Sequence, residues 1–127
     1  MTNASVAELI VATQAIRNGF NAYFPFSGAS KCDLILEREG KLKRIQTKKL
    51  WKNKRGNKVC QAVSQSYNRR TRKAYLPYGQ NEIDFLVAVE IETNDCWIIP
   101  IIDLTGITSN ISLDSRSKNK NNWELVY

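Results

Sequence analysis

The chain has 127 residues, of which 43% are hydrophobic, and a formal net charge of +7. This length predicts one domain, over residues 1–127, with a single hydrophobic core. Because the sequence contains no histidine, Ser-His and Cys-His triads are excluded, and any hydrolysis must use carboxylates, lysine and a metal ion that prefers oxygen.

The cysteine pattern and the absence of long apolar segments bear on the location of the protein. Cys32, Cys60 and Cys96 are too few and too far apart for a zinc site or a disulfide framework, so we expect buried, reduced thiols. No apolar run reaches the roughly 18 residues of a membrane span. The first residues also lack the pattern of a secretory signal. We therefore expect a soluble, cytoplasmic protein with no membrane partner.

The first predicted element is an amphipathic helix over residues 5–18. Ser5 and Glu8 have the spacing of a capping box, in which a hydroxyl and a carboxylate each accept a bond from a free backbone N–H group. Apolar residues then recur near the 3.6-residue period. The pair Asn18-Gly19 is a stop, since glycine tolerates the left-handed conformation that often follows a helix.

A short strand and a hairpin are predicted next. Phe20–Phe24 is aromatic and is followed by proline, which is typical of an edge strand. Cys32–Leu36 and Leu42–Lys48 flank Glu39-Gly40, which indicates a hairpin with a tight turn. If Glu39 and Gly40 are the two turn residues, Asp33 lies directly opposite Gln46. Alternation then places Asp33, Gln46 and Lys48 on one side of the hairpin, and Leu34, Leu36, Ile45 and Thr47 on the other.

The second half of the chain predicts two more strands and a tail. Ile83–Val89 is rich in β-branched residues and long enough for a central strand, and Cys96–Ile99 is expected to return beside it. Val59–Tyr67 fits a strand, a short helix or both. The polar stretch 114–122 is expected to be mobile, whereas Trp123, Leu125 and Tyr127 indicate docking, with a partner subunit as one candidate surface. This order predicts an α+β or α/β domain with a mixed sheet.

Positive charge is concentrated in one segment. Residues 41–73 contain thirteen Lys or Arg and no Asp or Glu, which is typical of a surface that binds a polyanion such as nucleic acid. A solvated charged face is the alternative, although charges of one sign repel each other. Trp51 and Tyr67 could stack on bases or belong to the core. The candidate nucleic-acid-binding residues are Lys31, Arg44, Lys49, Lys52, Lys54, Arg55, Lys58, Asn68, Arg69, Arg70, Arg72 and Lys73.

Asp33 followed by Gln46-Thr47-Lys48 resembles the motif of the PD-(D/E)XK nuclease superfamily, an Asp on one strand and (Glu/Asp)-X-Lys on the next. An acidic residue on the preceding helix often joins them, and here it would be Glu8. With the segments 7–12, 19–23, 32–35 and 83–89, the sequence is similar to the homing endonucleases of bacterial group I introns over about residues 5–103. It departs from the pattern at Gln46, which replaces the acidic residue, and at Cys32, which stands in place of proline.

The resemblance implies a nuclease core with a central mixed β-sheet flanked by helices, and a metal-dependent cut in double-stranded DNA. Glu8, Asp33, Gln46 and the Thr47 backbone carbonyl would bind Mg²⁺, with Mn²⁺ able to substitute and Ca²⁺ able to bind without supporting cleavage. Glu8, Asp33, Gln46 and Lys48 would be catalytic. Lys48 would orient or help to deprotonate water, or neutralise phosphate charge.

The resemblance also implies a homo-oligomer, with a tetramer as the first expectation and a dimer as the alternative. The C-terminal segment 104–127 is a candidate for oligomer contacts. The apolar residues of the second half are candidates for the interface, although the domain's own core could claim several of them: Ile101, Ile102, Leu104, Ile107, Ile111 and Leu113.

Several alternatives stay open at the level of sequence. A Holliday-junction resolvase-like or restriction-type nuclease would use the same motif. A non-catalytic nucleic-acid-binding protein would explain the charge, but would leave the alignment of Asp33, Gln46 and Lys48 as coincidence. An oligomeric structural protein that does not bind nucleic acid is a third class. Glu8 could serve only as a helix cap, and Asp84 is expected to orient the start of its strand rather than to bind metal.

Overall fold

A computed structural model describes residues 2–28, 30, 32–63, 78–79 and 81–127. Within these described residues, the helix α1 (Asn3–Arg17) comes first, and eight strands and three short 3-10 helices follow. The strands are β1 (Asn21–Tyr23), β2 (Leu34–Arg38), β3 (Lys41–Lys49), β4 (Trp51–Lys52), β5 (Lys58–Gln61), β6 (Phe85–Glu90), β7 (Asp95–Pro100) and β8 (Asn110–Ser112). The 3-10 helices are η1 (Ile101–Leu104), η2 (Ser117–Asn119) and η3 (Trp123–Val126).

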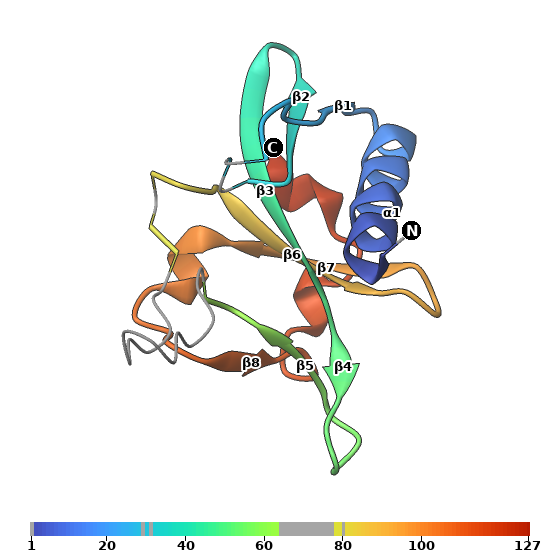
Figure 1. The fold of residues 1–127 in the computed structure, drawn as a ribbon, viewed down its shortest axis with the longest axis vertical. Helices are drawn as coiled ribbons and strands as arrows, with labels where there is room; N and C mark the ends of the chain where they lie inside the picture. Colours follow the sequence, from blue (N-terminus) through green and yellow to red (C-terminus); the bar gives the residue numbers. More distant parts are fainter. Residues whose placement is uncertain (1, 29, 31, 64–77, 80) are drawn as a thin grey trace.

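The strands form two sheets (Figure 1). A five-stranded mixed sheet has the order β1-β2-β3-β6-β7, in which β3 and β6 are parallel and the other neighbours are antiparallel. A three-stranded antiparallel sheet has the order β4-β5-β8. α1 and η3 pack on one face of the larger sheet, whereas β5, η1 and β8 pack on its other face. This arrangement confirms the α+β class with a mixed sheet.

The helix α1 begins earlier than the sequence predicted. Thr2 is the N-cap, and its hydroxyl accepts a hydrogen bond of 3.1 Å from the backbone N–H of Ser5. The predicted capping box at Ser5 and Glu8 is therefore wrong, because the earlier threonine already supplies the cap. Glu8 lies in the second turn and is available for another role. Small residues such as Ala7 and Ala15 form the buried face of the helix, which brings α1 close to the sheet.

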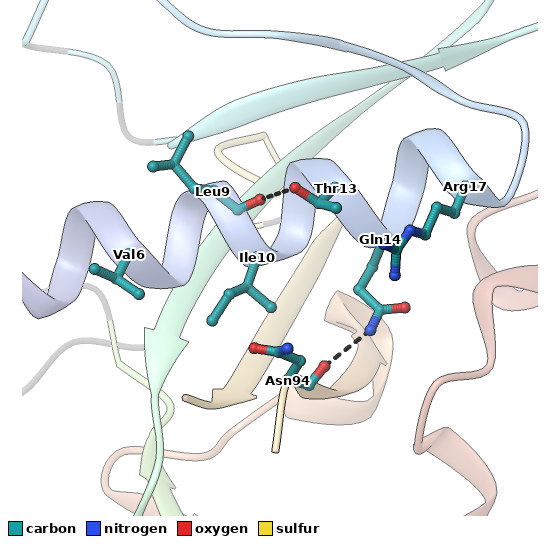
Figure 2. Close-up of a pocket in the computed structure, with 7 residues that line it drawn as sticks. All are labelled: Val6, Leu9, Ile10, Thr13, Gln14, Arg17 and Asn94. Atoms are coloured by element: carbon teal, nitrogen blue, oxygen red, sulfur yellow. Dashed lines mark hydrogen bonds between the residues drawn. The ribbon is translucent and has the colours of Figure 1, made fainter. Parts of the chain in front are cut away.

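The outward face of α1 carries larger apolar side chains than its buried face. Leu9, which is exposed, and Ile10, which also packs against the core, both line an open groove of about 240 Å³ (Figure 2). Gln14, another residue of the lining, donates a hydrogen bond of 3.0 Å to the backbone oxygen of Asn94. No helix in the described part of the chain is long and apolar enough to cross a membrane.

The hairpin of β2 and β3 has the predicted register. Glu39 and Gly40 are its two turn residues, with φ angles of 54° and 79°. Positive φ at both positions defines the primed turn whose twist matches that of paired strands. The pairs run from Arg38 opposite Lys41 to Leu34 opposite Ile45. The turn therefore fixes which residues of the two strands face each other.

β6 is the central strand that its composition predicted. All six of its residues are buried, and it pairs with β3 on one side and β7 on the other. Asp84, just before β6, accepts hydrogen bonds from the backbone and the guanidinium of Arg44 on β3. It orients the start of the strand, as expected. Of the segment with ambiguous structure, β5 occupies 58–61, and residues 64–67 lie outside the described residues.

The C-terminal segment packs on the chain's own core, which corrects the expectation of a mobile tail and leaves few of the candidate interface residues exposed. Leu104, Ile111 and Leu113 are buried in the core between the two sheets. Of the six apolar residues expected to form an interface, Ile102 alone is largely exposed, at 64%. The tail expected to be mobile is bonded to β7: Asn119 donates to the backbone oxygen of Ile98, and the side chain of Asn121 accepts from the backbone of Cys96.

The last residues complete the core under α1. Trp123 and Val126 in η3 are 3% and 1% exposed, and both belong to the cluster that joins α1 to the large sheet. The docking indicated by the aromatic residues of the tail therefore takes place within the chain. All three cysteines are buried and free, as predicted.

Candidate active site

Asp33 lies immediately before β2 and is held against β3. One oxygen of its carboxylate, Oδ2, accepts three hydrogen bonds: from Gln46 Nε2 at 2.9 Å, from the Thr47 backbone N–H at 2.8 Å and from Thr47 Oγ1 at 2.9 Å. Its own backbone N–H donates to the Ile45 carbonyl at 2.7 Å. These bonds fix the direction of the carboxylate relative to both residues of the β3 motif.

The side chain of Thr47 does not follow the predicted division of the hairpin into two sides. Strict alternation places Thr47 away from Asp33, yet its hydroxyl bonds the Asp33 carboxylate. The reason is local: Asp33 precedes Leu34, the first residue of β2, so the regular alternation of the strand does not determine where its side chain points. Asp33 and Gln46 are brought together as predicted.

Glu8 brings a second carboxylate to Asp33. Burial raises the pKa of Glu8, and the negative charge of Asp33 and a side-chain hydrogen bond with it raise that pKa further. Both carboxylates line one hollow of about 450 Å³, together with Phe24, Pro25, Phe26 and the loop that follows them. Two carboxylates this close repel each other unless a proton or a cation lies between them.

Lys48 lies on the same strand, two residues after Gln46, and is half-buried. Burial lowers the pKa of Lys48, although the charge of Asp33 and the thiol of Cys60 act to raise it. Its Nζ lies 5.8 Å from the centroid of the Tyr78 ring. The lysine therefore stands within electrostatic reach of Asp33, in a setting where loss of a proton is easier than in water.

The oxygen atoms around Asp33 suit a hard divalent cation. Gln46 Nε2 lies 2.9 Å from Asp33 Oδ2 and 3.4 Å from the Thr47 carbonyl oxygen, so both of these oxygens face the end of the amide. Rotating the amide by half a turn would direct its carbonyl oxygen to the same place. Within the described part of the chain, no group of three or more His, Cys, Asp and Glu could hold a metal. A cation here would need the neutral oxygens of Gln46 and Thr47 as well as the two carboxylates.

The predicted nucleic-acid-binding residues fall into three groups. Lys49, Lys52, Lys54 and Arg55 are exposed at the end of β3 and on the β4–β5 ribbon. Arg44 and Lys58 are engaged in ion pairs of 3.0 Å, with Asp84 and Glu90 respectively. The third group lies outside the described residues, and its members are Lys31, Asn68, Arg69, Arg70, Arg72 and Lys73.

The ion pair of Arg44 is a role that the sequence analysis missed. Burial acts to raise the pKa of Asp84, but hydrogen bonds from Arg44 outweigh it, so that the pKa is lowered. The Asp84 carboxylate is thus bound by hydrogen bonds to Arg44 on β3. No local sequence pattern predicts the ion pair between Arg44 and Asp84, because the two residues are forty positions apart.

The β4–β5 ribbon leads away from the carboxylate hollow. Its turn is closed by Asn53, whose side-chain oxygen accepts hydrogen bonds of 3.0 Å from the backbones of Arg55 and Asn57. Asn53 is thus occupied in shaping the turn. Trp51, at 42% exposure, lies on the surface of the ribbon rather than in the core.

Comparisons with known proteins agree with this geometry. A family model for PD-(D/E)XK endonucleases matches residues 2–125. The chain belongs to the PD-(D/E)XK endonuclease family. This PD-(D/E)XK endonuclease is also similar to a solved structure of a bacterial homing endonuclease, I-Ssp6803I, with a TM-score of 0.83 and 27% sequence identity. The similarity covers 97% of this chain and 89% of that one. The comparison with curated proteins finds no match.

The family assignment confirms the predicted superfamily and the predicted enzyme class. PD-(D/E)XK nucleases generally use divalent metal ions, which accords with the oxygen-rich surroundings of Asp33. The non-catalytic alternative loses its basis, because the match extends over the helix, the hairpin and the central strand together.

Proposed function

We propose that this PD-(D/E)XK endonuclease hydrolyses phosphodiester bonds of a specific double-stranded DNA site with Mg²⁺, as an intron-encoded homing endonuclease does. The observation that carries the proposal is the pair of facing carboxylates, Glu8 and Asp33, in one hollow. Lys48 stands within electrostatic reach of Asp33 on the adjacent strand. Mn²⁺ is expected to replace Mg²⁺, and Ca²⁺ to bind without supporting cleavage.

Each residue of the site has a chemical task in this proposal. Asp33, Glu8, Gln46 and the Thr47 carbonyl would hold the cation. The bound cation supplies an activated water and stabilises the charge that develops on the phosphate. The three hydrogen bonds to Asp33 keep its carboxylate in place without help from the metal. Lys48, with its lowered pKa, would orient the attacking water or accept its proton, or as a cation neutralise phosphate charge.

The exposed basic residues support duplex DNA as the substrate. Exposed cations extend from the end of β3 along the ribbon, where they can contact phosphates of a bound duplex: Lys49, Lys52, Lys54 and Arg55. The segments at 31 and 68–73 would add further contacts. We also propose a homo-oligomer, with a tetramer as first choice and a dimer as the alternative. The three buried thiols support a location in the cytoplasm.

The decisive experiment uses a duplex recovered by cleavage of a randomised DNA library with Mg²⁺. Asp33→Asn should lower the rate of cleavage by at least about 100-fold, while binding of the same duplex survives or tightens. Removing one negative charge weakens the cation site and also lessens repulsion of the phosphate. Asp103→Asn is the matched control, because Asp103 is an exposed aspartate on η1.

Two results would contradict the proposal. If Asp33→Asn cleaves like the wild type, the carboxylate pair is not the metal site. If Asp33→Asn loses binding in parallel with cleavage while its fold is intact, Asp33 serves DNA binding rather than the reaction. A wild-type protein that cuts no duplex in the library with Mg²⁺, Mn²⁺ or Co²⁺ would overturn the proposed function itself.

A further inference from the structure

Two phenylalanine rings at the rim of the carboxylate hollow are exposed to solvent. Phe26 is fully exposed, at 108%, and Phe24 is 49% exposed. Burial of such a large apolar side chain would be favourable. Single exposed apolar residues are common on surfaces, but here two rings follow each other on one short loop. A surface of this kind indicates a partner that covers it.

The position of the rings points to the identity of that partner. Phe24, Pro25 and Phe26 line the same hollow as Glu8 and Asp33. In the proposed function, the scissile phosphate must reach these carboxylates. In a complex with DNA the rings would therefore stand beside the scissile phosphate. The apolar groups that DNA presents so close to its backbone are the faces of its bases.

We infer that Phe26, supported by Phe24, inserts between base pairs next to the scissile phosphate and so positions the phosphodiester at the carboxylates. The inference rests on the proposed function, and it adds a positioning residue and a source of sequence preference. Pro25 favours the role because its ring fixes φ between the two phenylalanines and limits the freedom of the loop.

The energetics predict an effect on positioning more than on affinity. Unstacking a base step costs free energy, while stacking of a base on an aromatic side chain returns a similar amount. These contributions nearly cancel, so the insertion adds little net affinity. Its result is a kinked duplex with the phosphate turned toward the hollow. Flexible pyrimidine–purine steps unstack most easily, so we expect TA or CA beside the cut.

The test compares Phe26→Ala with the wild type on the duplex recovered by cleavage. The adenine analogue 2-aminopurine is placed at the steps that flank the cut, and Ca²⁺ holds the complex uncut. Wild-type binding should increase the 2-aminopurine fluorescence, because the base unstacks. Phe26→Ala should lose this increase, and with Mg²⁺ its kcat should fall about 10- to 100-fold while its Kd stays within a few-fold. Phe26→Leu, which keeps an apolar wedge, should retain part of both.

Ile16→Ala is the matched control, because Ile16 is an exposed apolar residue (59%) at the far end of α1. It should change neither fluorescence nor kcat. Normal fluorescence and kcat in Phe26→Ala would overturn the inference and leave the proposed function standing. Normal fluorescence with a smaller species in sedimentation would also overturn it and assign the ring to a subunit contact. A wild-type enzyme that cuts no duplex would overturn the proposed function and this inference together.

Discussion

The side chain of Gln46 determines how much charge the site carries. With glutamine in place of an acidic residue, the β3 strand contributes an amide, and the negative charge beside Asp33 comes from Glu8 on α1. The charge balance of the proposed metal site therefore depends on Glu8. In the absence of a cation, its ionisation is opposed by burial and by Asp33.

This opposition predicts how Glu8→Gln changes stability with pH. The pKa of Glu8 is raised in the folded protein above its ordinary value of 4.5, so the folded state holds this proton more tightly than the unfolded chain. Stability therefore falls as the pH rises from about 4.5 through the folded pKa. Glutamine does not ionise, so Glu8→Gln should raise the melting temperature in EDTA near pH 7 and leave it unchanged near about pH 4.

Addition of Mg²⁺ at neutral pH should reverse this difference. In the proposed site the wild type would bind the cation with both carboxylates and gain stability from it, whereas Glu8→Gln would gain less. Thermal denaturation with and without Mg²⁺ measures both effects. Glu92→Gln, at an exposed glutamate in the β6–β7 turn, is the control. Equal responses of wild type and Glu8→Gln to pH and to Mg²⁺ would show that Glu8 is not paired with Asp33.

The proposed role of Lys48 leads to a separate prediction about a single residue. Lys48→Ala should lower kcat by about 10²- to 10⁴-fold, the range for loss of a group that moves or positions a proton, with at most a modest loss of DNA affinity. Lys41→Ala, at the exposed start of β3, should leave kcat unchanged. Single-turnover cleavage separates the chemical step from binding. A loss of affinity as large as the loss of rate would assign Lys48 to phosphate binding in the ground state.

Among the secondary-structure elements, the β4–β5 ribbon makes a prediction about salt. Each phosphate that a Lys or Arg neutralises contributes about −0.9 to the slope of log K against log salt. Replacing Lys52, Lys54 and Arg55 by Ala should therefore flatten the slope measured by fluorescence anisotropy. Lys118→Ala, at an exposed lysine in η2, serves as the control. An unchanged slope in the triple variant would place the duplex on another surface.

The tail makes a prediction about stability. Trp123 is 3% exposed and lies beneath α1. The centroid of its ring is 6.4 Å from the centroid of the Phe20 ring. Trp123→Ala should lower the free energy of unfolding by about 3–5 kcal/mol, measured by urea denaturation. Leu42→Ala, at an exposed leucine near the hairpin turn, should change it by less than about 0.5 kcal/mol. A small effect of Trp123→Ala would mean that the tail is held by something other than this core.

The secondary-structure elements also show which features of the fold can be predicted from the sequence alone. The hairpin register followed from one pair, Glu39-Gly40, because a two-residue turn fixes every partner on both strands. The start of α1 was misplaced because Thr2 and Ser5 are both able to cap a helix. The tail gave no periodic pattern: its order comes from Asn119 and Asn121, which bond β7 more than twenty positions away. Contacts at that separation leave no local trace in the sequence.

On the scale of the whole molecule, the candidate site and the exposed positive charge of the β4–β5 ribbon lie on different elements. The site draws on α1, the loop before β2, and β3, which are brought together by the sheet rather than by sequence proximity. Asp33 and Gln46 are linked by a two-residue turn, but Glu8 joins them only because the small residues of α1 let the helix lie close to β3. The acid pair is thus a product of tertiary packing.

The last prediction concerns oligomerisation. One domain of this size covers about one helical turn of duplex, on the order of 10 base pairs, and one carboxylate hollow cuts one strand. Selection of a single genomic site needs a specificity ratio on the order of 10⁶ or more.

Two-fold symmetry supplies both a longer footprint and a second site facing the other strand. Most of the candidate interface residues, Leu104, Ile111 and Leu113 among them, are internal, so the proposed subunit contact would use other surfaces. Sedimentation velocity at micromolar concentration should show a tetramer, or a dimer as the alternative, both free and on DNA. A monomer of 14.5 kDa that stays monomeric on its duplex would exclude a double-strand cut by one complex and would leave a nicking enzyme.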